Sequence, residues 1–272
     1  MTKGERQRSL RVEVDEQHAS ALLGHRRTQR RHRRRLGNPA LLIGDCQYSS
    51  HAVHPGTRNV ERRVRHNRGV SVEKYRLLLL RHGETEWSKS GKHTGRTDLE
   101  LTDEGREQAT LARDALADLQ LRDPLVVSSP RHRALVTAEL AGLSVDEVNP
   151  VLAEWDYGDY EGLTTPEIRE STPDWTVWKY GCPGGESTAA VSERADRAVA
   201  LALSHMESRD VVFVGHGHFS RSVMTRWIEL PISEGIRVSM AAASIAVCGF
   251  EHGVRQITAL GLTGHPNPCL PA

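Results

Sequence analysis

The sequence predicts an α/β fold, a three-layer α/β/α sandwich around a mostly parallel central sheet. Short apolar runs alternate along the chain with segments of helical spacing, and this alternation indicates helices packed on a parallel sheet. Several of the runs are continuous, as in Leu77-Leu78-Leu79-Leu80. Continuous runs are typical of strands that are buried on both faces.

Five short segments carry strand signals, and the last two are expected to pair antiparallel across the turn at 251–253. The expected strands span residues 76–80, 124–127, 211–214, 244–250 and 254–260. In open α/β sheets, ligands bind beyond the carboxyl ends of the strands. The residues that directly follow the first three strands are therefore the first place to look for chemistry.

Three segments carry helix signals. The expected helices span residues 102–120, 133–141 and 188–206. The first has Thr102 as a candidate N-cap, with Asp103 and Glu104 in the first turn, where acidic side chains favour the helix dipole. The third follows the turn Gly184-Gly185-Glu186-Ser187.

The formal net charge of +1 over 272 residues conceals a strong asymmetry. Residues 1–70 hold 16 Lys and Arg against 6 Asp and Glu, whereas the remainder holds 20 against 29. We interpret residues 1–70 as a basic, disordered extension, residues 71–265 as one domain and residues 266–272 as a tail. Two alternatives stay open for the extension: an arm that binds nucleic acid or another polyanion, and translated sequence upstream of a start near Val70 or Val72. Few aromatic residues accompany its arginines, which disfavours the nucleic-acid role.

Cysteine usage and hydropathy bear on the location of the protein. The four cysteines are scattered without a CxxC pair, a pattern that indicates reduced thiols and a cytoplasmic protein. No apolar run approaches the roughly 18–20 residues that span a bilayer. A secretion signal is disfavoured, because the apolar stretch after Arg33-Arg34-Arg35 is interrupted by Gly37-Asn38-Pro39.

Basic and imidazole side chains mark the ends of the first three expected strands. Arg81 and His82 end the first, Arg133 follows the second and His216 ends the third. Guanidinium groups match the charge and geometry of a phosphoryl group, and a neutral imidazole is a competent nucleophile. The nearby arginines are expected to lower the pKa of His82 and keep its ring neutral.

The string Arg81-His82-Gly83-Glu84-Thr85 resembles the R-H-G-E-T signature of the histidine phosphatase superfamily, the phosphoglycerate mutase-like enzymes. Five further blocks follow in the order of that family. They are Thr94-Gly95 with Asp98, Leu101-Thr102 and Gly105; Ser128-Ser129-Pro130 with Arg133-Ala134 and Thr137-Ala138; Leu152-Ala153-Glu154 with Gly158 and Glu161-Gly162; Gly184-Gly185-Glu186-Ser187; and Val214-Gly215-His216-Gly217. The six blocks cover about residues 74–262, and the resemblance implies the phosphoglycerate mutase-like fold.

The resemblance implies a phosphomonoester hydrolase, with the broad range of an acid phosphatase, that acts on small phosphorylated substrates. It implies that His82 becomes phosphohistidine and that Arg81, Arg133 and His216 hold the phosphoryl oxygens. Glu154 is expected to protonate the leaving oxygen and later to activate water. The expected substrate-binding residues are Arg81, Ser88, Thr94, Gly95, Arg133, His216 and Gly217.

The resemblance implies that no metal is needed, and neither a metal site nor another cofactor is expected here. The pair His216 and His218 lacks an acidic or cysteine ligand at supporting spacing. Asp156, Asp159 and Glu161 compete with Glu154 for the proton-donor role, and position within the block favours Glu154. This assignment predicts activity weighted toward mildly acidic pH.

Departures from the family pattern favour its phosphatase branch. His218 stands where mutases carry Asn, and the segment between Gly162 and Gly184 lacks the Arg pair that mutases use. Ser88 also replaces a usual Asn, so a phosphate contact there is made by a hydroxyl or is lost. Trp155, Trp175 and Trp178 either line an apolar substrate pocket or pack in the core, and core packing is favoured for at least two of them.

Two alternatives to the hydrolase remain open at this point. One is a cofactor-dependent phosphoglycerate mutase, which returns the phosphoryl group to its substrate. The other is a non-catalytic phosphate- or polyanion-binding protein, which the five intact catalytic candidates disfavour. A homodimer is a further expectation by analogy with similar enzymes. The sequence does not identify the physiological phosphoester or the imidazole nitrogen that attacks.

Overall fold

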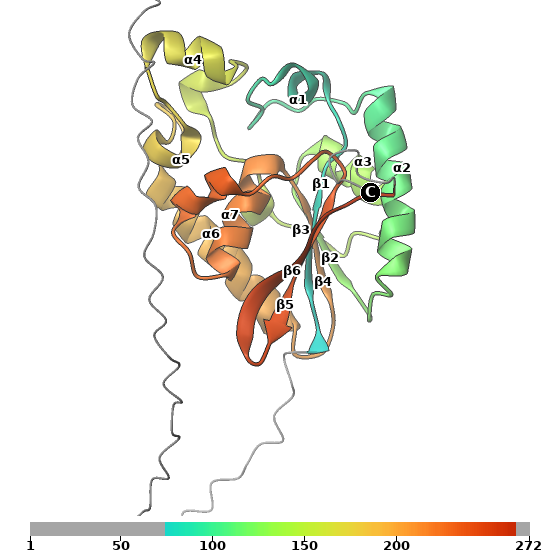
Figure 1. The fold of residues 1–272 in the computed structure, drawn as a ribbon. Helices are drawn as coiled ribbons and strands as arrows, with labels where there is room; N and C mark the ends of the chain where they lie inside the picture. Colours follow the sequence, from blue (N-terminus) through green and yellow to red (C-terminus); the bar gives the residue numbers. More distant parts are fainter. Residues whose placement is uncertain (1–73, 265–272) are drawn as a thin grey trace, which may run out of the picture. The chain divides into compact units, whose positions relative to one another are not determined.

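The computed structural model describes residues 74–264, so the predicted extension (1–70) and tail (266–272) lie outside the described residues. Six strands form one sheet with the order β3-β2-β4-β1-β5-β6 (Figure 1). The strands are β1 (Leu77–Arg81), β2 (Leu125–Ser128), β3 (Glu147–Val148), β4 (Val211–Gly215), β5 (Ile245–Glu251) and β6 (Val254–Leu262).

The central pairings of the sheet are parallel, as the sequence predicted. β1 pairs with β4, β4 with β2 and β2 with β3, all in parallel. β5 runs antiparallel to β1 and to β6. Since β1, β2 and β4 run in the same direction, their carboxyl ends lie at one edge of the sheet.

Helices cover both faces of the sheet. The α-helices of the described residues are α1 (Glu86–Ser90), α2 (Asp103–Asp118), α3 (His132–Leu140), α4 (Thr165–Ser171), α5 (Val177–Tyr180), α6 (Thr188–His205) and α7 (Gly217–Trp227). Figure 1 shows α2 and α3 on one side of the sheet and α6 and α7 on the other. The chain is therefore a three-layer α/β/α sandwich.

The continuous apolar run of β1 has partners on both faces. Leu78 and Leu80 join the core cluster that contains residues of α2 and α3, whereas Leu77 and Leu79 join the cluster that contains residues of α6 and α7. Successive side chains of a strand point to opposite faces, so a strand between two helical layers must be apolar at every position. The four leucines are at most 1% exposed.

All five expected strands and all three expected helices are present, with ends shifted by a few residues. The Thr102 hydroxyl caps α2 by accepting from the N–H of Gly105, and Ser187 caps α6 in the same way. The sequence did not reveal α1, α4, α5, α7 and β3. α7 carries no capping signal, because the side chain of its N-cap His216 makes no capping hydrogen bond.

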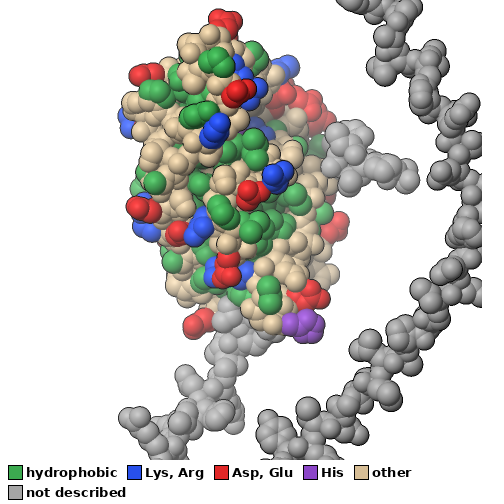
Figure 2. Space-filling model, turned by 60° about the vertical axis from the view of Figure 1, so that its left-hand side comes forward, with side chains coloured by type: hydrophobic (Ala, Val, Ile, Leu, Met, Phe, Trp, Pro, Cys, Tyr) green, Lys and Arg blue, Asp and Glu red, His purple; other side chains and the backbone are tan. Residues whose placement is uncertain are grey.

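The described surface is mixed in charge. Figure 2 shows one face, on which basic, acidic and hydrophobic side chains are interspersed rather than gathered by type. Within residues 74–264, no helix is long and apolar enough to cross a membrane.

Candidate active site

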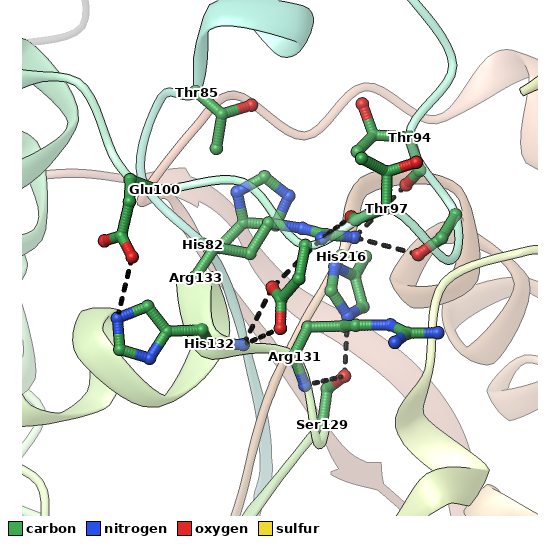
Figure 3. Close-up of polar contacts among 12 residues, drawn as sticks. His82, Thr85, Thr94, Thr97, Glu100, Ser129, Arg131, His132, Arg133 and His216 are labelled. Atoms are coloured by element: carbon green, nitrogen blue, oxygen red, sulfur yellow. Dashed lines mark hydrogen bonds and ion pairs between the residues drawn. The ribbon is translucent and has the colours of Figure 1, made fainter. Parts of the chain in front are cut away.

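The polar side chains at the carboxyl edge of the sheet come from three neighbouring strands. Arg81 is paired with Gly215 across β1 and β4, and Ser128 of β2 is paired with Val214. His82, Ser129 and His216 therefore leave the sheet at the same level (Figure 3). Three segments far apart in the sequence meet here because the strands are parallel.

Two glycines allow the loop after His82 to lie against the start of α2. A Cβ on Gly83 would lie 2.2 Å from the carbonyl oxygen of Gly105, and a Cβ on Gly105 would lie 2.1 Å from that of Glu84. No other residue fits this backbone approach. The N–H of Gly83 also donates to Thr137 Oγ1 at 3.0 Å, which ties the loop to α3.

The tautomer of His82 follows from its hydrogen bond. Its Nδ1 lies 2.7 Å from the carbonyl oxygen of Gly83, and a carbonyl only accepts, so Nδ1 carries the hydrogen. Nε2 is left with its lone pair. Burial, followed by the charges of Arg133 and Arg81, lowers the pKa of His82 well below its usual value. The imidazole is consequently neutral and nucleophilic at Nε2.

His216 lies beside His82, with the ring centroids 5.2 Å apart. Its Nε2 is 2.7 Å from Ser129 Oγ, and its buried Nδ1 has no hydrogen-bond partner among the described residues. Burial, followed by the charge of Arg133, lowers the pKa of His216 well below its usual value. An unpartnered buried nitrogen is costly, which indicates that a ligand completes its bonding.

Two guanidinium groups flank the imidazoles. Arg133 is fully buried and donates to the carbonyl oxygens of Thr97 at 2.8 Å, Thr94 at 3.2 Å and Gly95 at 3.3 Å. Arg81 donates to the carbonyl oxygen of Met240 at 2.6 Å. The Nε atoms of both arginines are buried and unbonded within the described part of the chain. The charges are fixed in place and retain donors for an anion.

The carboxylate of Glu154 is held by three backbone N–H groups. Its Oε1 accepts from Trp155 and Phe219 at 2.8 Å each, and its Oε2 accepts from His218 at 3.0 Å. The last two donors belong to the first turn of α7, where N–H groups lack partners within the helix. Glu154 is 8% exposed and lines the same cavity as His82.

A partly buried ion pair between Arg194 and Glu186 also holds the backbone of the loop that carries Glu154. Arg194 of α6 donates to both carboxylate oxygens of Glu186, at 2.9 and 2.6 Å. It also donates to the carbonyl oxygens of Val151, Ala153 and Glu154. This single guanidinium connects a helix of the sandwich to the loop that carries the carboxyl group.

The cavity has a volume of about 170 Å³. It is lined by Arg81, His82, Ser88, Gly91, Lys92, His93, Thr94, Glu154, Tyr157, Gly217, His218, Arg221 and Met240. Of the expected site residues, Arg133, Gly95 and His216 do not line it. Trp155, Trp175 and Trp178 are buried in the core and do not line it either.

Two of the expected substrate-binding groups are already engaged within the protein. The Ser88 hydroxyl accepts from the N–H of Thr85 at 2.9 Å and donates to the carbonyl of Thr85 at 3.0 Å, as part of the cap of α1. The N–H of Gly95 donates to the carboxylate of Glu161 at 2.9 to 3.0 Å. Their contacts position the loops that form the cavity wall.

The sequence analysis did not identify five of the residues that line the cavity: four with polar or charged side chains and one methionine. They are Lys92, His93, Tyr157, Arg221 and Met240. Tyr157 lies three residues after Glu154, and Arg221 lies one helical turn after His218 on α7. Recognising α7 in the sequence would have indicated that Arg221 shares a face with His218. Among residues 74–264, no three His, Cys, Asp or Glu side chains are grouped as metal ligands.

The neutral imidazole of His82 with a free Nε2, the guanidinium of Arg81 and the carboxyl group of Glu154 line one cavity, and such a combination is typical of an enzyme of phosphoryl transfer. The profile of the Histidine phosphatase superfamily (branch 1) matches residues 77–263. The chain belongs to this family, and it is a phosphatase.

The chain is similar to two phosphatases and to one further solved structure. The chain is 66% identical over 199 residues to an acid phosphatase of Mycobacterium tuberculosis, covering 73% of this chain and 98% of that protein. A solved structure of an open reading frame product from Mycobacterium tuberculosis is 68% identical, with a TM-score of 0.70 over 70% of this chain and 99% of that one. A mycobacterial glucosyl-3-phosphoglycerate phosphatase, solved with VO3, is 30% identical, with a TM-score of 0.60 over 69% and 98% of the two chains.

Proposed function

We propose that the protein hydrolyses phosphomonoesters in two steps through a phosphohistidine on Nε2 of His82. The observation that carries the proposal is the hydrogen bond from Nδ1 to the Gly83 carbonyl, because it leaves the Nε2 lone pair at the cavity. Splitting hydrolysis into two displacements at one nucleophile lowers each barrier.

In the first step, the Nε2 lone pair of His82 attacks phosphorus and the bond to the ester oxygen breaks. Glu154 gives its proton to that oxygen, so the alcohol leaves neutral. In the second step, a water oxygen attacks phosphorus, the carboxylate of Glu154 takes a proton from the water, and the phosphorus–nitrogen bond breaks. The imidazole regains its lone pair and inorganic phosphate is released.

The charge of the phosphoryl group is balanced by fixed donors in both steps. Arg81 and Arg133 each keep a buried, unbonded Nε–H, and donors fixed before the reaction stabilise developing charge best. When the Ser129 hydroxyl donates to Nε2 of His216, the unpartnered Nδ1 carries a hydrogen and becomes a further donor. Ser88, Thr94, Gly95 and Gly217 are proposed to complete the phosphate site through their loops.

Activity at mildly acidic pH is consistent with the two neutral imidazoles. Burial and the neighbouring arginines lower the pKa values of both imidazoles well below the usual value, so His82 stays unprotonated and reactive at a lower pH than an ordinary histidine. The relative from Mycobacterium tuberculosis is an acid phosphatase. We propose the same pH preference for this chain, with a broad range of small phosphorylated substrates.

The test is a phosphatase screen that compares the intact protein with His82→Ala and the control His132→Ala. His132 begins α3, which follows β2 at the same edge of the sheet. Its side chain is half exposed and pairs with Glu100, so it serves as the control (Figure 3). We expect His82→Ala to lose at least about 10³-fold in kcat, and rapid quenching of the intact protein to trap an acid-labile phosphoenzyme. Full activity in His82→Ala, or conversion of 3-phosphoglycerate to its isomer without phosphate release, would contradict hydrolysis at His82.

Three further properties belong to the proposal. The guanidinium groups supply the positive charge that a metal ion would otherwise provide, so we propose that activity survives a chelator. A cytoplasmic location is supported by the sparse, scattered cysteines. A homodimer is proposed by analogy with similar enzymes, and sedimentation of the purified chain tests it.

A further inference from the structure

One acidic residue of the family blocks has no part in the two steps above. Glu161 belongs to the same sequence block as Glu154, but its side chain does not line the cavity. It is half-buried, and within residues 74–264 its carboxylate is bonded to backbone N–H groups rather than to a cation. Placing a charge out of water is costly, so this arrangement calls for a physical explanation.

The loop between α1 and α2 supplies the partners of Glu161. The N–H of Gly95 donates to Oε1 at 3.0 Å and to Oε2 at 2.9 Å, and the N–H of Thr97 donates to Oε1 at 2.9 Å. A Cβ on Gly95 would lie 2.9 Å from Oε2 of Glu161 and 2.5 Å from the carbonyl oxygen of Trp155. The missing side chain of Gly95 is therefore what lets the carboxylate approach this loop.

Arg133 holds the same loop by its carbonyl oxygens, those of Thr94, Gly95 and Thr97 (Figure 3). The C=O of Thr94 and the N–H of Gly95 belong to one trans peptide group, in which they point in opposite directions. This peptide group accepts from the guanidinium with its oxygen and donates to the carboxylate with its nitrogen. Because opposite charges lie at its two ends, each hydrogen bond strengthens the other.

Asp98 gives Arg133 less support than the loop does. Its Oδ1 lies 3.8 Å from Arg133 Nη1, beyond hydrogen-bond distance, and its side chain is 42% exposed. Its two oxygens accept from the N–H of His132 at 3.0 and 3.1 Å, which commits Asp98 to the start of α3. The loop carbonyls therefore orient the guanidinium, since they accept three hydrogen bonds from it and leave Nε–H free.

The other phosphate-binding guanidinium lacks such a support. Arg81 donates to the carbonyl oxygen of Met240 and has no carboxylate within ion-pair distance in the described part of the chain. It lines the cavity, whereas Arg133 does not. A small shift of the loop would therefore matter more for Arg133, whose free donor must reach the phosphoryl group from outside the cavity wall.

We propose that Glu161 is a positioning residue for Arg133: through the Thr94–Gly95 peptide group, its carboxylate holds the guanidinium where the free Nε–H meets the phosphoryl group. The inference rests on the proposed hydrolysis and names a residue that serves its phosphate site. In this arrangement a negative charge supports a positive one without neutralising it, because a peptide group lies between them. The guanidinium keeps its charge for the substrate.

The test measures the binding of inorganic phosphate by calorimetry, and kcat and KM for one alkyl and one aryl phosphate, in the full-length protein and its variants. We expect Glu161→Ala to weaken phosphate binding and to lower kcat/KM about tenfold to hundredfold, the effect of a donor misplaced by about 1 Å. Glu161→Gln keeps Oε1 as an acceptor for both N–H groups but loses the charge, so it should lose less. The losses should be equal for the two esters, because both carry the same phosphoryl group.

A double-mutant cycle with Arg133→Lys assigns the effect to Arg133. Lysine keeps the positive charge but not the planar fork, so the loop no longer has an orientation to set. In the Arg133→Lys protein, Glu161→Gln should therefore weaken phosphate binding by less than about twofold.

Asp156→Asn is the matched control. Asp156 also contacts this loop, but through the exposed side chain of Arg96, with Arg96 Nη2 and Asp156 Oδ2 2.7 Å apart, and exposed ion pairs contribute little. Its phosphate binding and kcat/KM should equal those of the intact protein. The melting temperature of every variant is measured alongside.

Each contrary result has its own meaning. Losses that add in the cycle would overturn the link between Glu161 and Arg133. Unequal losses for the alkyl and the aryl ester would show that Glu161 acts on the leaving group instead. A lower melting temperature of Glu161→Gln with unchanged phosphate binding and kcat/KM would leave it a structural role alone. If phosphate binding depends on Glu161 as expected but no ester is hydrolysed, the positioning of Arg133 stands and the proposed hydrolysis fails.

Discussion

The phosphoryl end of the cavity, around Arg81 and His82, and the part of its wall formed by His93, Tyr157, His218 and Arg221 are built from different parts of the fold. At the phosphoryl end, Arg81, His82 and His216 follow directly from the ends of parallel strands, and their positions are fixed by sheet register. The wall comes from loops and from one face of α7. The first part is fixed by hydrogen bonds to the backbone and by burial, whereas the second is fixed by ring packing and a few side-chain contacts.

The difference separates reaction from selection. A phosphoryl group is the same in every phosphomonoester, so a rigid strand-end site suits it. The leaving alcohol varies, and residues on loops and helix faces can change without disturbing the sheet. Substitutions at the phosphoryl end should therefore affect all substrates alike, and substitutions at the wall should affect substrates unequally.

Glu154 serves both the phosphoryl group and the leaving alcohol. Its replacement should therefore give the largest difference in kcat between alkyl and aryl phosphates. We expect Glu154→Gln to lower kcat about 10²–10⁴-fold for alkyl phosphates, because amide groups give no proton to the leaving oxygen. An aryl phosphate with a good leaving group should show a rapid burst followed by slow turnover, since only water activation then needs the carboxylate. Rapid mixing with an aryl and an alkyl phosphate checks this. Equal losses for both substrates, without a burst, would remove Glu154 from the donor role.

Arg194 is a positioning residue for Glu154, and its loss should have a smaller effect of the same kind. Arg194→Met removes the donors to the 151–154 backbone and leaves Glu186 unpaired. We expect kcat/KM to fall about tenfold to hundredfold, more for alkyl than for aryl phosphates.

Arg226→Met is the matched control for Arg194→Met. It breaks the ion pair between Arg226 of α7 and Asp196 of α6, whose Nε and Oδ1 atoms are 2.6 Å apart. Neither residue contacts the loop that carries Glu154, so the ratio of alkyl to aryl phosphatase activity should stay unchanged. If both variants lose stability in urea and neither changes that ratio, Arg194 has a structural role alone.

The smallest of the expected effects is the change in the pH dependence of the free energy of unfolding when His93 is replaced. Unfolded histidine takes up a proton near pH 6.5, whereas folded His93 does so only near 4. The unfolded state therefore binds more protons between these values, and the free energy of unfolding falls as the pH is lowered from about 6.5 to about 4. His93→Gln should make this slope shallower.

Urea unfolding at several pH values measures that slope, with the exposed His252→Gln as the control that preserves it. His82, His216 and His218 contribute in the same direction, because their pKa values are also lowered. The slope of His93→Gln should therefore be reduced but not zero. An identical slope in His93→Gln and the intact protein would show that His93 is protonated alike in both states.

Much of the fold could be predicted from local patterns, and the exceptions have physical reasons. β1 was recognisable because strands buried on both faces must be apolar throughout. α4 carried an overlooked signal, since Thr164 and Glu167 form a capping box. α7 carried none, because its buried face includes Ser220, Ser222 and Thr225, which do not form an apolar stripe.

By itself, the sequence determined the α/β class, every strand of the described sheet except β3, the capped helices α2 and α6, and the family whose motifs point to Arg81, His82, Arg133, Glu154 and His216. These features depend on residue type and spacing along the chain. The tertiary structure decided which nitrogen of His82 is free, how far burial lowers the histidine pKa values, and which cations lack partners. Each of these depends on what lies beside a group in space, and the decisive neighbours, such as Glu154 and α7, are distant in sequence.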